Sequence, residues 1–194
     1  MTKLLLVDNF DSFTYLLKSY FEELGASVDV ISASVDEFIE TINYDALIIS
    51  PGPKRPEDAY LSRKILRENA GKIPILGVCL GHQIIGLEYG SNVVKGEKPM
   101  HGVVSSVTHN GRNLFKNIPA KTEFARYHSL VVSTCPEGFV VDATSDDGVI
   151  QAMSNEELAL YSVQFHPESV ASIDGKKLLK NFLEIANDFS KISR

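Results

Sequence analysis

A cysteine lies between two glycines in the stretch Gly77-Val78-Cys79-Leu80-Gly81. An apolar run precedes this stretch and helical spacing follows it, so the pattern predicts a sharp turn between a buried strand and a helix. Such a turn gives a nucleophile a constrained backbone, and the flanking glycines let neighbouring chain segments come close. A helix N-terminus also favours the thiolate through its dipole. Cys79 is therefore a candidate nucleophile, although a buried core cysteine between packing glycines fits the same pattern.

A thiolate nucleophile needs a base and a group that orients the base. His166 and Glu168 occur together in the stretch Gln164-Phe165-His166-Pro167-Glu168. His166 could take the proton of the thiol, and Glu168 could accept a hydrogen bond from the imidazole and fix its tautomer. Alone, these two residues also fit a solvated pair on a loop. Beside the cysteine motif they predict a Cys–His–Glu triad.

Acyl transfer through a tetrahedral intermediate also needs backbone N–H groups aimed at the developing oxyanion. Gly52 follows an apolar run in Ser50-Pro51-Gly52-Pro53 and is the first candidate donor. The amide of Leu80, directly after the nucleophile, is the second. An ordinary Pro-Gly turn is the alternative interpretation of the first stretch.

Two further segments are candidates for contact with a substrate. Gln83 lies four residues after Cys79, so both face the same side of the predicted helix. Residues 127–130, which include Ser129 and Leu130, precede a predicted strand and offer polar backbone at its edge. For either segment alone, a purely structural role is the better explanation.

The composition is that of an ordinary globular protein. Of the 194 residues 44% are hydrophobic, enough for one core, so we expect a single domain over residues 1–194. Lys plus Arg number 19 against 25 Asp plus Glu, a formal net charge of −6, and no basic run occurs. This balance argues against an extended phosphate-binding surface, so a nucleic-acid partner is not expected.

The N-terminal apolar run at residues 4–7 is too short for a signal peptide or a membrane span. We therefore expect a soluble, cytoplasmic protein with no membrane partner. Cys79 and Cys135 make no disulfide framework; one bond between them stays open, but a reducing compartment is the simpler interpretation. His82, His101 and His109 have no zinc-type spacing with a cysteine, so no metal is expected. No phosphate-binding glycine loop occurs either, and no cofactor is expected.

Strand and helix patterns alternate through the first half of the chain. Strands are predicted at residues 3–8, 27–31, 46–49 and 73–78, and helices at 12–24, 35–42, 57–69 and 81–89. Ser12 is the expected N-cap of the first helix and Gly25 its C-terminal stop. Strands that are apolar throughout and alternate with helices are typical of a parallel sheet covered on both faces.

The second half has shorter segments that are rich in Val, Thr, Ser and Gly. Strands are predicted at residues 101–109, 129–133, 139–143, 149–154 and 159–163, followed by an amphipathic helix at 176–189. We therefore expect an α/β fold: an open, mostly parallel central sheet with helices on both faces, plus additional antiparallel strands in the second half. Sites in such folds lie at the C-terminal ends of the strands, where Gly52 and Cys79 fall.

Taken together and in this order, the motifs resemble those of the class I (triad-type) glutamine amidotransferases. Within that family they resemble the small subunits of anthranilate synthase and aminodeoxychorismate synthase. The matching stretches span nearly the whole chain, at residues 8–14, 48–53, 74–83, 100–102, 126–132 and 163–169. The chain departs from the usual family pattern at Lys54, Leu16 and Val103.

The resemblance implies that Cys79 is the nucleophile, His166 the base and Glu168 its partner. It places the L-glutamine site on a set of binding residues: Gly52, Pro53, Lys54, Leu80, Gln83, Ser129 and Leu130. It also implies that residues 8–14 lie near the interface with a larger, chorismate-binding synthase subunit, which receives the ammonia.

Anthranilate synthase, in tryptophan biosynthesis, is the first expectation for that partner. Aminodeoxychorismate synthase, in p-aminobenzoate and folate biosynthesis, and a subunit shared by both enzymes are the alternatives. Two other classes of function stay open: a free-standing cysteine hydrolase acting on γ-glutamyl or peptide bonds, and a catalytically silent module that regulates a partner.

Overall fold

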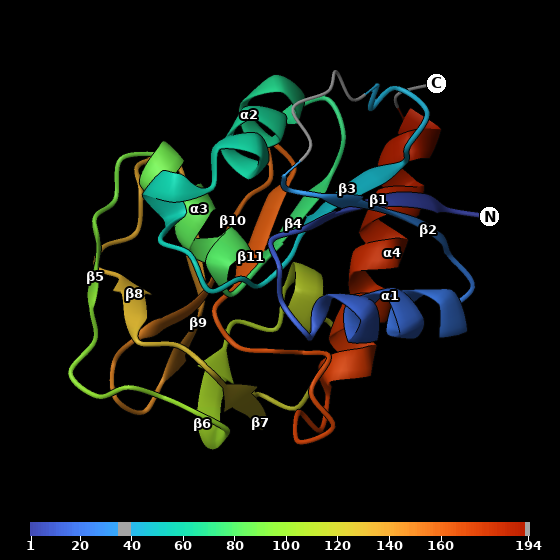
Figure 1. Cartoon of the computed structure of the whole chain (residues 1–194). Helices are drawn as coiled ribbons and strands as arrows, with labels where there is room; N and C mark the ends of the chain where they lie inside the picture. Colours follow the sequence, from blue (N-terminus) through green and yellow to red (C-terminus); the bar gives the residue numbers. More distant parts are fainter. Residues whose placement is uncertain (35–39, 193–194) are drawn as a thin grey trace.

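The structure is a computed structural model that describes residues 1–34 and 40–192. Within these residues, a nine-stranded sheet runs through the molecule in the order β2-β1-β3-β4-β11-β10-β9-β6-β7 (Figure 1). Neighbouring strands from β2 to β11 pair in parallel, and those from β11 to β7 pair antiparallel. The expected α/β fold, with its parallel sheet extended by antiparallel strands, is confirmed.

The strands of this sheet, in chain order, are β1 (Lys3–Asp8), β2 (Ser27–Ser32), β3 (Ala46–Ile49), β4 (Ile75–Val78), β6 (Val103–His109), β7 (Lys121–Arg126), β9 (Val140–Ser145), β10 (Ile150–Asn155) and β11 (Leu160–Val163). A separate antiparallel pair consists of β5 (Val93–Lys95) and β8 (Leu130–Val132). The helices are α1 (Thr14–Glu23), α2 (Tyr60–Asn69), α3 (Leu80–Glu88) and α4 (Gly175–Ile192), with short 3₁₀ turns η1 (Pro56–Asp58) and η2 (Asn113–Phe115).

The helices cover both faces of the parallel part of the sheet, with α1 and α4 on one face and α2 and α3 on the other (Figure 1). Side chains alternate along β1 accordingly: Leu4 and Leu6 join the core layer that holds Phe21 and Phe182. Leu5 and Val7 join the opposite layer, together with apolar residues of α2 and α3. Burial on both sides is why the sequence of β1 is an unbroken apolar run.

The parallel strands β3, β4 and β11 end at the same edge of the sheet. The segments that follow them are the Pro-Gly loop after Ile49, the turn at Cys79 after Val78, and the stretch after Val163 that leads to His166. Because parallel neighbours share their carboxyl edge, three motifs that are far apart in the sequence meet at one place.

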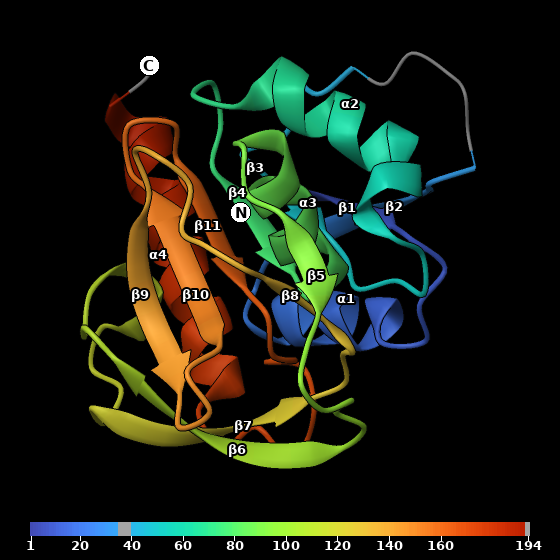
Figure 2. The same cartoon turned by 90° about the vertical axis from the view of Figure 1, so that its left-hand side faces the viewer.

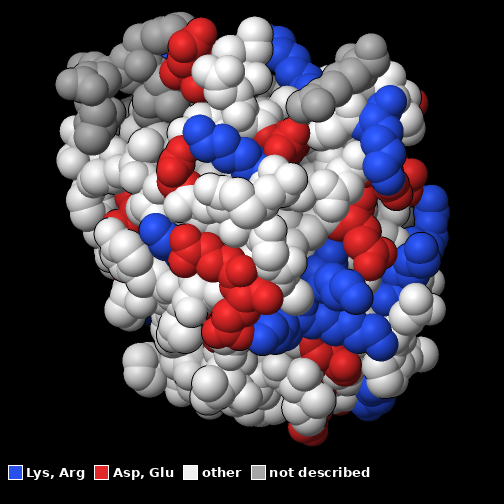
Figure 3. Space-filling view, turned by 90° about the vertical axis from the view of Figure 1, so that its right-hand side faces the viewer, with Lys and Arg blue, Asp and Glu red and all other residues white. Residues whose placement is uncertain are grey.

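The antiparallel strands curve away from the parallel part, with β6 and β7 lying below β9 and β10 in Figure 2. Opposite the pair β5 and β8, the outer surface around the N-terminus carries basic and acidic side chains next to one another (Figure 3). Ion pairs join elements of the fold, such as Lys176 of α4 with Glu23 of α1. Among the described helices, none is long and apolar enough to cross a membrane.

Several element boundaries differ from the sequence prediction. The first helix begins at Thr14, and its N-cap position is Phe13 rather than Ser12, with no side-chain cap bond. The carboxylate of Asp11 accepts the N–H of Phe13 just before the helix. Gly25 does follow the helix, with φ +91°. The helix expected at 57–69 is divided into η1 and α2. The one expected at 35–42 falls mostly on residues 35–39, which lie outside the described residues, and residues 40–42 are not helical.

Candidate functional site

Cys79 is the single residue between the end of β4 and the start of α3, and it has a left-handed backbone with φ 52° and ψ −97°. A non-glycine residue in this region costs of order 1–3 kcal/mol and persists only where the surroundings impose it. Here the N–H of Cys79 donates to the carbonyl of Val163 at 2.8 Å, which ties the turn to β11. The side chain is held at the N-terminus of α3 and is 6% exposed.

The two flanking glycines are required by close backbone contacts. A Cβ atom on Gly77 would lie 2.5 Å from the carbonyl oxygen of Gly81. One on Gly81 would lie 2.4 Å from the carbonyl oxygen of Ile49. The turn therefore packs directly against itself and against β3, which explains the spacing of the glycines around the cysteine.

His166 and Glu168 form a fully buried pair beside this turn. The imidazole Nδ1 lies 2.6 Å from Oε1 of Glu168, and their side chains are 2% and 0% exposed. Since the carboxylate accepts at Nδ1, the other ring nitrogen, Nε2, is left to act as a base, and it has no hydrogen-bond partner among the described residues. The ring packs against both Phe13 and Tyr127, with centroid distances of 4.9 and 5.1 Å.

Charge compensates the burial of this histidine. Burial opposes the imidazolium, but the charges of Glu168 and of the Cys79 thiolate outweigh it and raise the pKa of His166 well above its usual value. Cys79 and His166 follow the neighbouring parallel strands β4 and β11 at the same edge of the sheet. The amide Nε2 of Gln164, two residues before His166, lies 3.7 Å from the sulfur of Cys79.

The Pro-Gly loop is held in place by Asn9, which follows β1. The backbone N–H of Asn9 donates to Oγ of Ser50 at 2.9 Å, and its side-chain amide donates to the carbonyl of Ser50 at 3.1 Å. Oγ of Ser62 donates to the amide oxygen of Asn9 at 2.7 Å. A Cβ on Gly52 would lie 2.7 Å from both Cβ of Asn9 and Cδ2 of Leu80. The two predicted oxyanion residues, Gly52 and Leu80, are therefore in contact.

The remaining predicted binding residues fall into two groups. Gln83 uses both hydrogens of its amide, donating to the carbonyl of Leu130 at 3.0 Å and to Oε1 of Gln164 at 3.2 Å. Gln83 and Leu130 are thus connected through Gln164 to Cys79. The exposed group comprises Pro53, Lys54 and Ser129. The ammonium of Lys54 lies 5.3 Å from the ring centroid of Phe10, outside the hydrogen-bonded part of the site.

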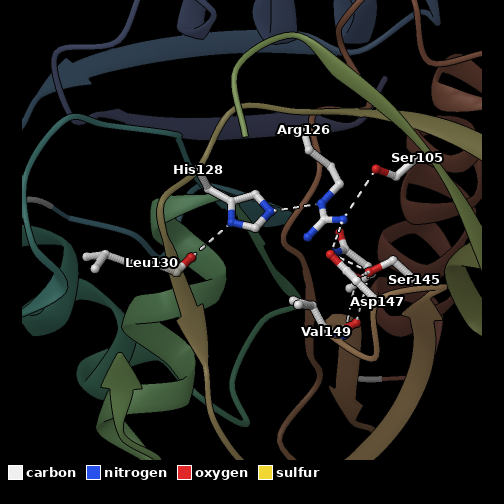
Figure 4. A network of polar contacts seen from close by, with 8 residues as sticks. Ser105, Arg126, His128, Leu130, Ser145, Asp147 and Val149 are labelled. Atoms are coloured by element: carbon white, nitrogen blue, oxygen red, sulfur yellow. Dashed lines mark hydrogen bonds and ion pairs between the residues drawn. The ribbon is translucent and has the colours of Figure 1, made fainter. Parts of the chain in front are cut away.

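Sequence reasoning placed His128 only in the candidate stretch 127–130 and gave Arg126 no role, but the side chains of both residues share a network of polar contacts with Leu130 (Figure 4). They stood in a matching stretch of sequence, but nothing in their spacing showed that their side chains pair with each other. Among the described residues, His, Cys, Asp and Glu side chains form no group that could hold a metal ion. Buried His82 instead bonds to Oγ of Ser162 at 2.9 Å.

Comparisons with known proteins show the family. The family described as glutamine amidotransferase class-I matches residues 5–186. The chain is 44% identical over 186 residues to the aminodeoxychorismate/anthranilate synthase component 2 of Bacillus subtilis, covering 93% of this chain and 95% of that protein. It is 41% identical over 191 residues to the bifunctional protein TrpGD of Thermotoga maritima, covering 95% of this chain but only 32% of that longer protein.

Among solved structures, a putative GMP synthase subunit from Thermoplasma acidophilum superposes with a TM-score of 0.88 at 27% sequence identity. The superposition covers 99% of this chain and 97% of that one, so both the parallel and the antiparallel parts of the sheet are shared. From the family match over residues 5–186 and the full-length relative, the chain belongs to the class I glutamine amidotransferase family.

Proposed function

We propose that Cys79, His166 and Glu168 hydrolyse the side-chain amide of L-glutamine and that a separate synthase subunit uses the ammonia. One observation carries this proposal: a buried imidazole, oriented by Glu168 through Nδ1, keeps Nε2 unpaired beside a cysteine in a constrained turn. A nucleophile, a base and an orienting carboxylate are the three parts of a triad.

In the first half of the reaction, the thiolate of Cys79 attacks the amide carbon of glutamine and a C–S bond forms. The carbonyl oxygen takes the negative charge. When the tetrahedral intermediate collapses, the C–N bond breaks and His166 donates its Nε2 proton to the leaving nitrogen, which departs as ammonia. A γ-glutamyl thioester remains on Cys79.

In the second half, His166 takes a proton from water and the resulting hydroxide attacks the thioester carbonyl. The C–S bond breaks, glutamate leaves, and the thiolate–imidazolium pair is restored. A positioned base contributes about 10²–10⁴-fold to such steps. The raised pKa of His166 suits this role, because the imidazole must hold a proton when the ammonia leaves.

The oxyanion would be held by the backbone amides of Gly52 and Leu80. The N–H of Leu80 is the first of α3, and the first N–H groups of a helix have no partner within it. Gly52 lies against the side chain of Leu80 and its loop is fixed by Asn9, which supports its N–H as the second donor. Pre-oriented donors of this kind stabilise the transition state without reorganising.

For the rest of glutamine, we propose Gln83, Ser129 and Leu130 as the recognition residues, with the loop at Pro53 and Lys54 over the opening. Because both amide hydrogens of Gln83 are engaged, its Oε1 is the group available to a substrate. An acceptor at this position suits the α-ammonium of glutamine rather than its α-carboxylate.

As the receiving enzyme we propose a larger chorismate-binding subunit, in the cytoplasm, with anthranilate synthase as the first candidate. The name of the Bacillus relative joins aminodeoxychorismate and anthranilate synthase, which supports a subunit that serves either or both. An exposed apolar strip beside the site fits a covered interface: Phe10 is 48% exposed, Tyr15 63% and Leu16 37%.

The test uses the chain reconstituted with each of the two large synthase subunits. Cys79→Ala should abolish product formation from glutamine while product formation from added ammonia continues. Cys135→Ala, at the other cysteine, is the matched control and should retain both. Glutaminase activity that survives in Cys79→Ala would refute the assignment of the nucleophile. The large subunit that restores glutamine-dependent synthesis identifies the pathway.

A further inference from the structure

Arg126, at the end of β7, is a buried cation behind the glutamine-site backbone. Its side chain is 2% exposed. Nη1 donates to Oδ2 of Asp147 at 2.8 Å and to Oγ of Ser105 at 3.3 Å, and Nε donates to Nε2 of His128 at 3.1 Å (Figure 4). The guanidinium is therefore anchored at one end by a carboxylate of the β9–β10 turn and contacts a histidine at the other.

This contact decides the tautomer of His128. A guanidinium has only donors, so Nε2 of His128 must be an unprotonated acceptor. Burial, together with the charge of Arg126, lowers the pKa of His128 to about 4, and the ring is neutral at pH 7. Its one proton is therefore on Nδ1, and it donates to the carbonyl of Leu130 at 3.0 Å.

The carbonyl of Leu130 connects this pair to the nucleophile. It accepts the N–H of His128 and also the amide of Gln83 at 3.0 Å. The second amide hydrogen of Gln83 goes to Gln164, whose own amide approaches the sulfur of Cys79. A continuous chain of donors and acceptors thus runs from the buried cation to the thiol across β7, β8, α3 and the end of β11.

We propose that Arg126 and His128 are positioning residues for glutamine: they fix the Leu130 carbonyl and through it the orientation of the Gln83 amide. This inference rests on the proposed function. Neither residue touches the reacting atoms. Their loss should therefore weaken glutamine binding and leave the thiol reactive, since the turn at Cys79 and the His166–Glu168 pair are held by separate contacts.

The test compares His128→Asn with His128→Leu. The two side chains have the same branching, but only asparagine can place an N–H where Nδ1 of the histidine now lies. His128→Leu should raise the KM for glutamine about five- to tenfold, the effect of one lost neutral hydrogen bond to the Leu130 carbonyl, which then keeps only the amide of Gln83. His128→Asn should stay within about twofold of the parent, and kcat should change less than KM in both.

Arg126→Lys supplies a second variant that keeps the charge opposite Asp147. A lysine cannot place a donor at the position of Nε, so the tautomer of His128 is no longer imposed and KM should again rise. Nitrogen NMR of the parent protein should show His128 neutral and protonated on Nδ1. Thermal unfolding of each variant checks that it is folded before the kinetics are measured.

Two readouts separate this inference from the proposed function. Alkylation of Cys79 by iodoacetamide should proceed at the parent rate in all three variants. An unchanged KM in a folded His128→Leu, or a His128 protonated on Nε2, would overturn the positioning role while leaving the triad intact. A parent protein that hydrolyses no glutamine with either of the large synthase subunits would instead overturn the proposed function itself.

Discussion

Gly175, the first residue of α4, lies directly against the backbone of Pro167: a Cβ on Gly175 would come within 1.8 Å of the carbonyl oxygen of Pro167. Pro167 separates His166 from Glu168 in the chain. The start of the last helix therefore sets the position of the loop that carries both residues. Because Gly175 lies outside every catalytic motif, its role follows only from packing.

Gly175→Ala should disrupt the site as well as the fold. The extra methyl group must push Pro167 aside, and overpacking of this kind costs about 1–3 kcal/mol. We expect a lower free energy of unfolding in urea and a loss of glutaminase activity of more than tenfold, because displacement of the loop moves Nε2 of His166 away from the thiol.

The matched control is Gly111→Ala. Gly111 has φ +74° and no atom within 4 Å of an added Cβ, so this variant carries only the backbone strain of a left-handed alanine, about 1–2 kcal/mol. It should keep full activity. Parent-like activity in Gly175→Ala would contradict the close packing between α4 and the Pro167 loop.

Local patterns in the sequence were sufficient to predict the elements that position the site. The apolar run of β1 and the glycine spacing around Cys79 each reflect one local requirement, burial on two faces in the first case and a tight turn in the second. The common edge of β3, β4 and β11 then follows from parallel pairing, which brings Cys79 and His166 together. Their catalytic roles stay predictions.

Features that depend on contacts between distant residues could not be predicted. Asn9 holds the Gly52 loop through a side chain whose partners, Ser50 and Ser62, are far along the chain. The ion pair of Arg126 with Asp147 is likewise nonlocal.

The strand β7 was missed, by contrast, although a local signal was present. Charged residues alternate with other residues over part of residues 121–126, a period-two pattern typical of a strand.

Glu168→Gln tests the orienting carboxylate. The carboxylate raises the pKa of His166 against the effect of burial, so its removal should lower that pKa. A glutamine amide can also donate to Nδ1, which would move the ring proton to Nε2 and block proton uptake from the thiol. We expect kcat for glutamine hydrolysis to fall by about 10²-fold or more.

Steady-state glutaminase kinetics measure this loss, and nitrogen NMR of His166 follows its titration. Glu137→Gln, at an exposed position, is the charge-matched control. If Glu168→Gln left the titration of His166 where it is in the parent, the carboxylate would not be the group that holds the imidazolium.

Gly52→Ala tests the loop that faces Leu80. An added Cβ would lie 2.7 Å from atoms of both Asn9 and Leu80, so the loop must move and its N–H must leave the proposed oxyanion position. Loss of one such donor costs about 10²–10³-fold in kcat. Alkylation of Cys79 needs no oxyanion donor and should stay near the parent rate.

Pro53→Ala is the control for this prediction, since Pro53 is exposed and next in the chain. It should change kcat much less than Gly52→Ala. Equal effects of the two substitutions would mean that general disturbance of the loop, rather than the close approach at Gly52, determines the activity.

Buried His82 predicts a loss of stability in acid. Burial, with a smaller contribution from His128, lowers its pKa from 6.5 to about 3, so the folded protein keeps this ring neutral. Between these two values the unfolded chain binds more protons, and the free energy of unfolding therefore falls as the pH falls. The slope from one such group approaches about 1.4 kcal/mol per pH unit.

His82→Asn removes this titration but keeps an amide donor for Oγ of Ser162, the partner of Nδ1. At pH 7.5, urea unfolding measures how much the substitution lowers the free energy of unfolding through packing alone. This packing cost does not change with pH. Between pH 6 and pH 4 the free energy of unfolding of the variant should fall less steeply than that of the parent, by up to about 1.4 kcal/mol per pH unit. The reason is that the unfolded variant no longer gains a proton at this position. Burial and the bond to Ser162 both oppose protonation of His82 in the folded protein. If the free energy of unfolding fell equally steeply with pH in the two proteins over that range, His82 would be protonated in the fold as readily as in the unfolded chain.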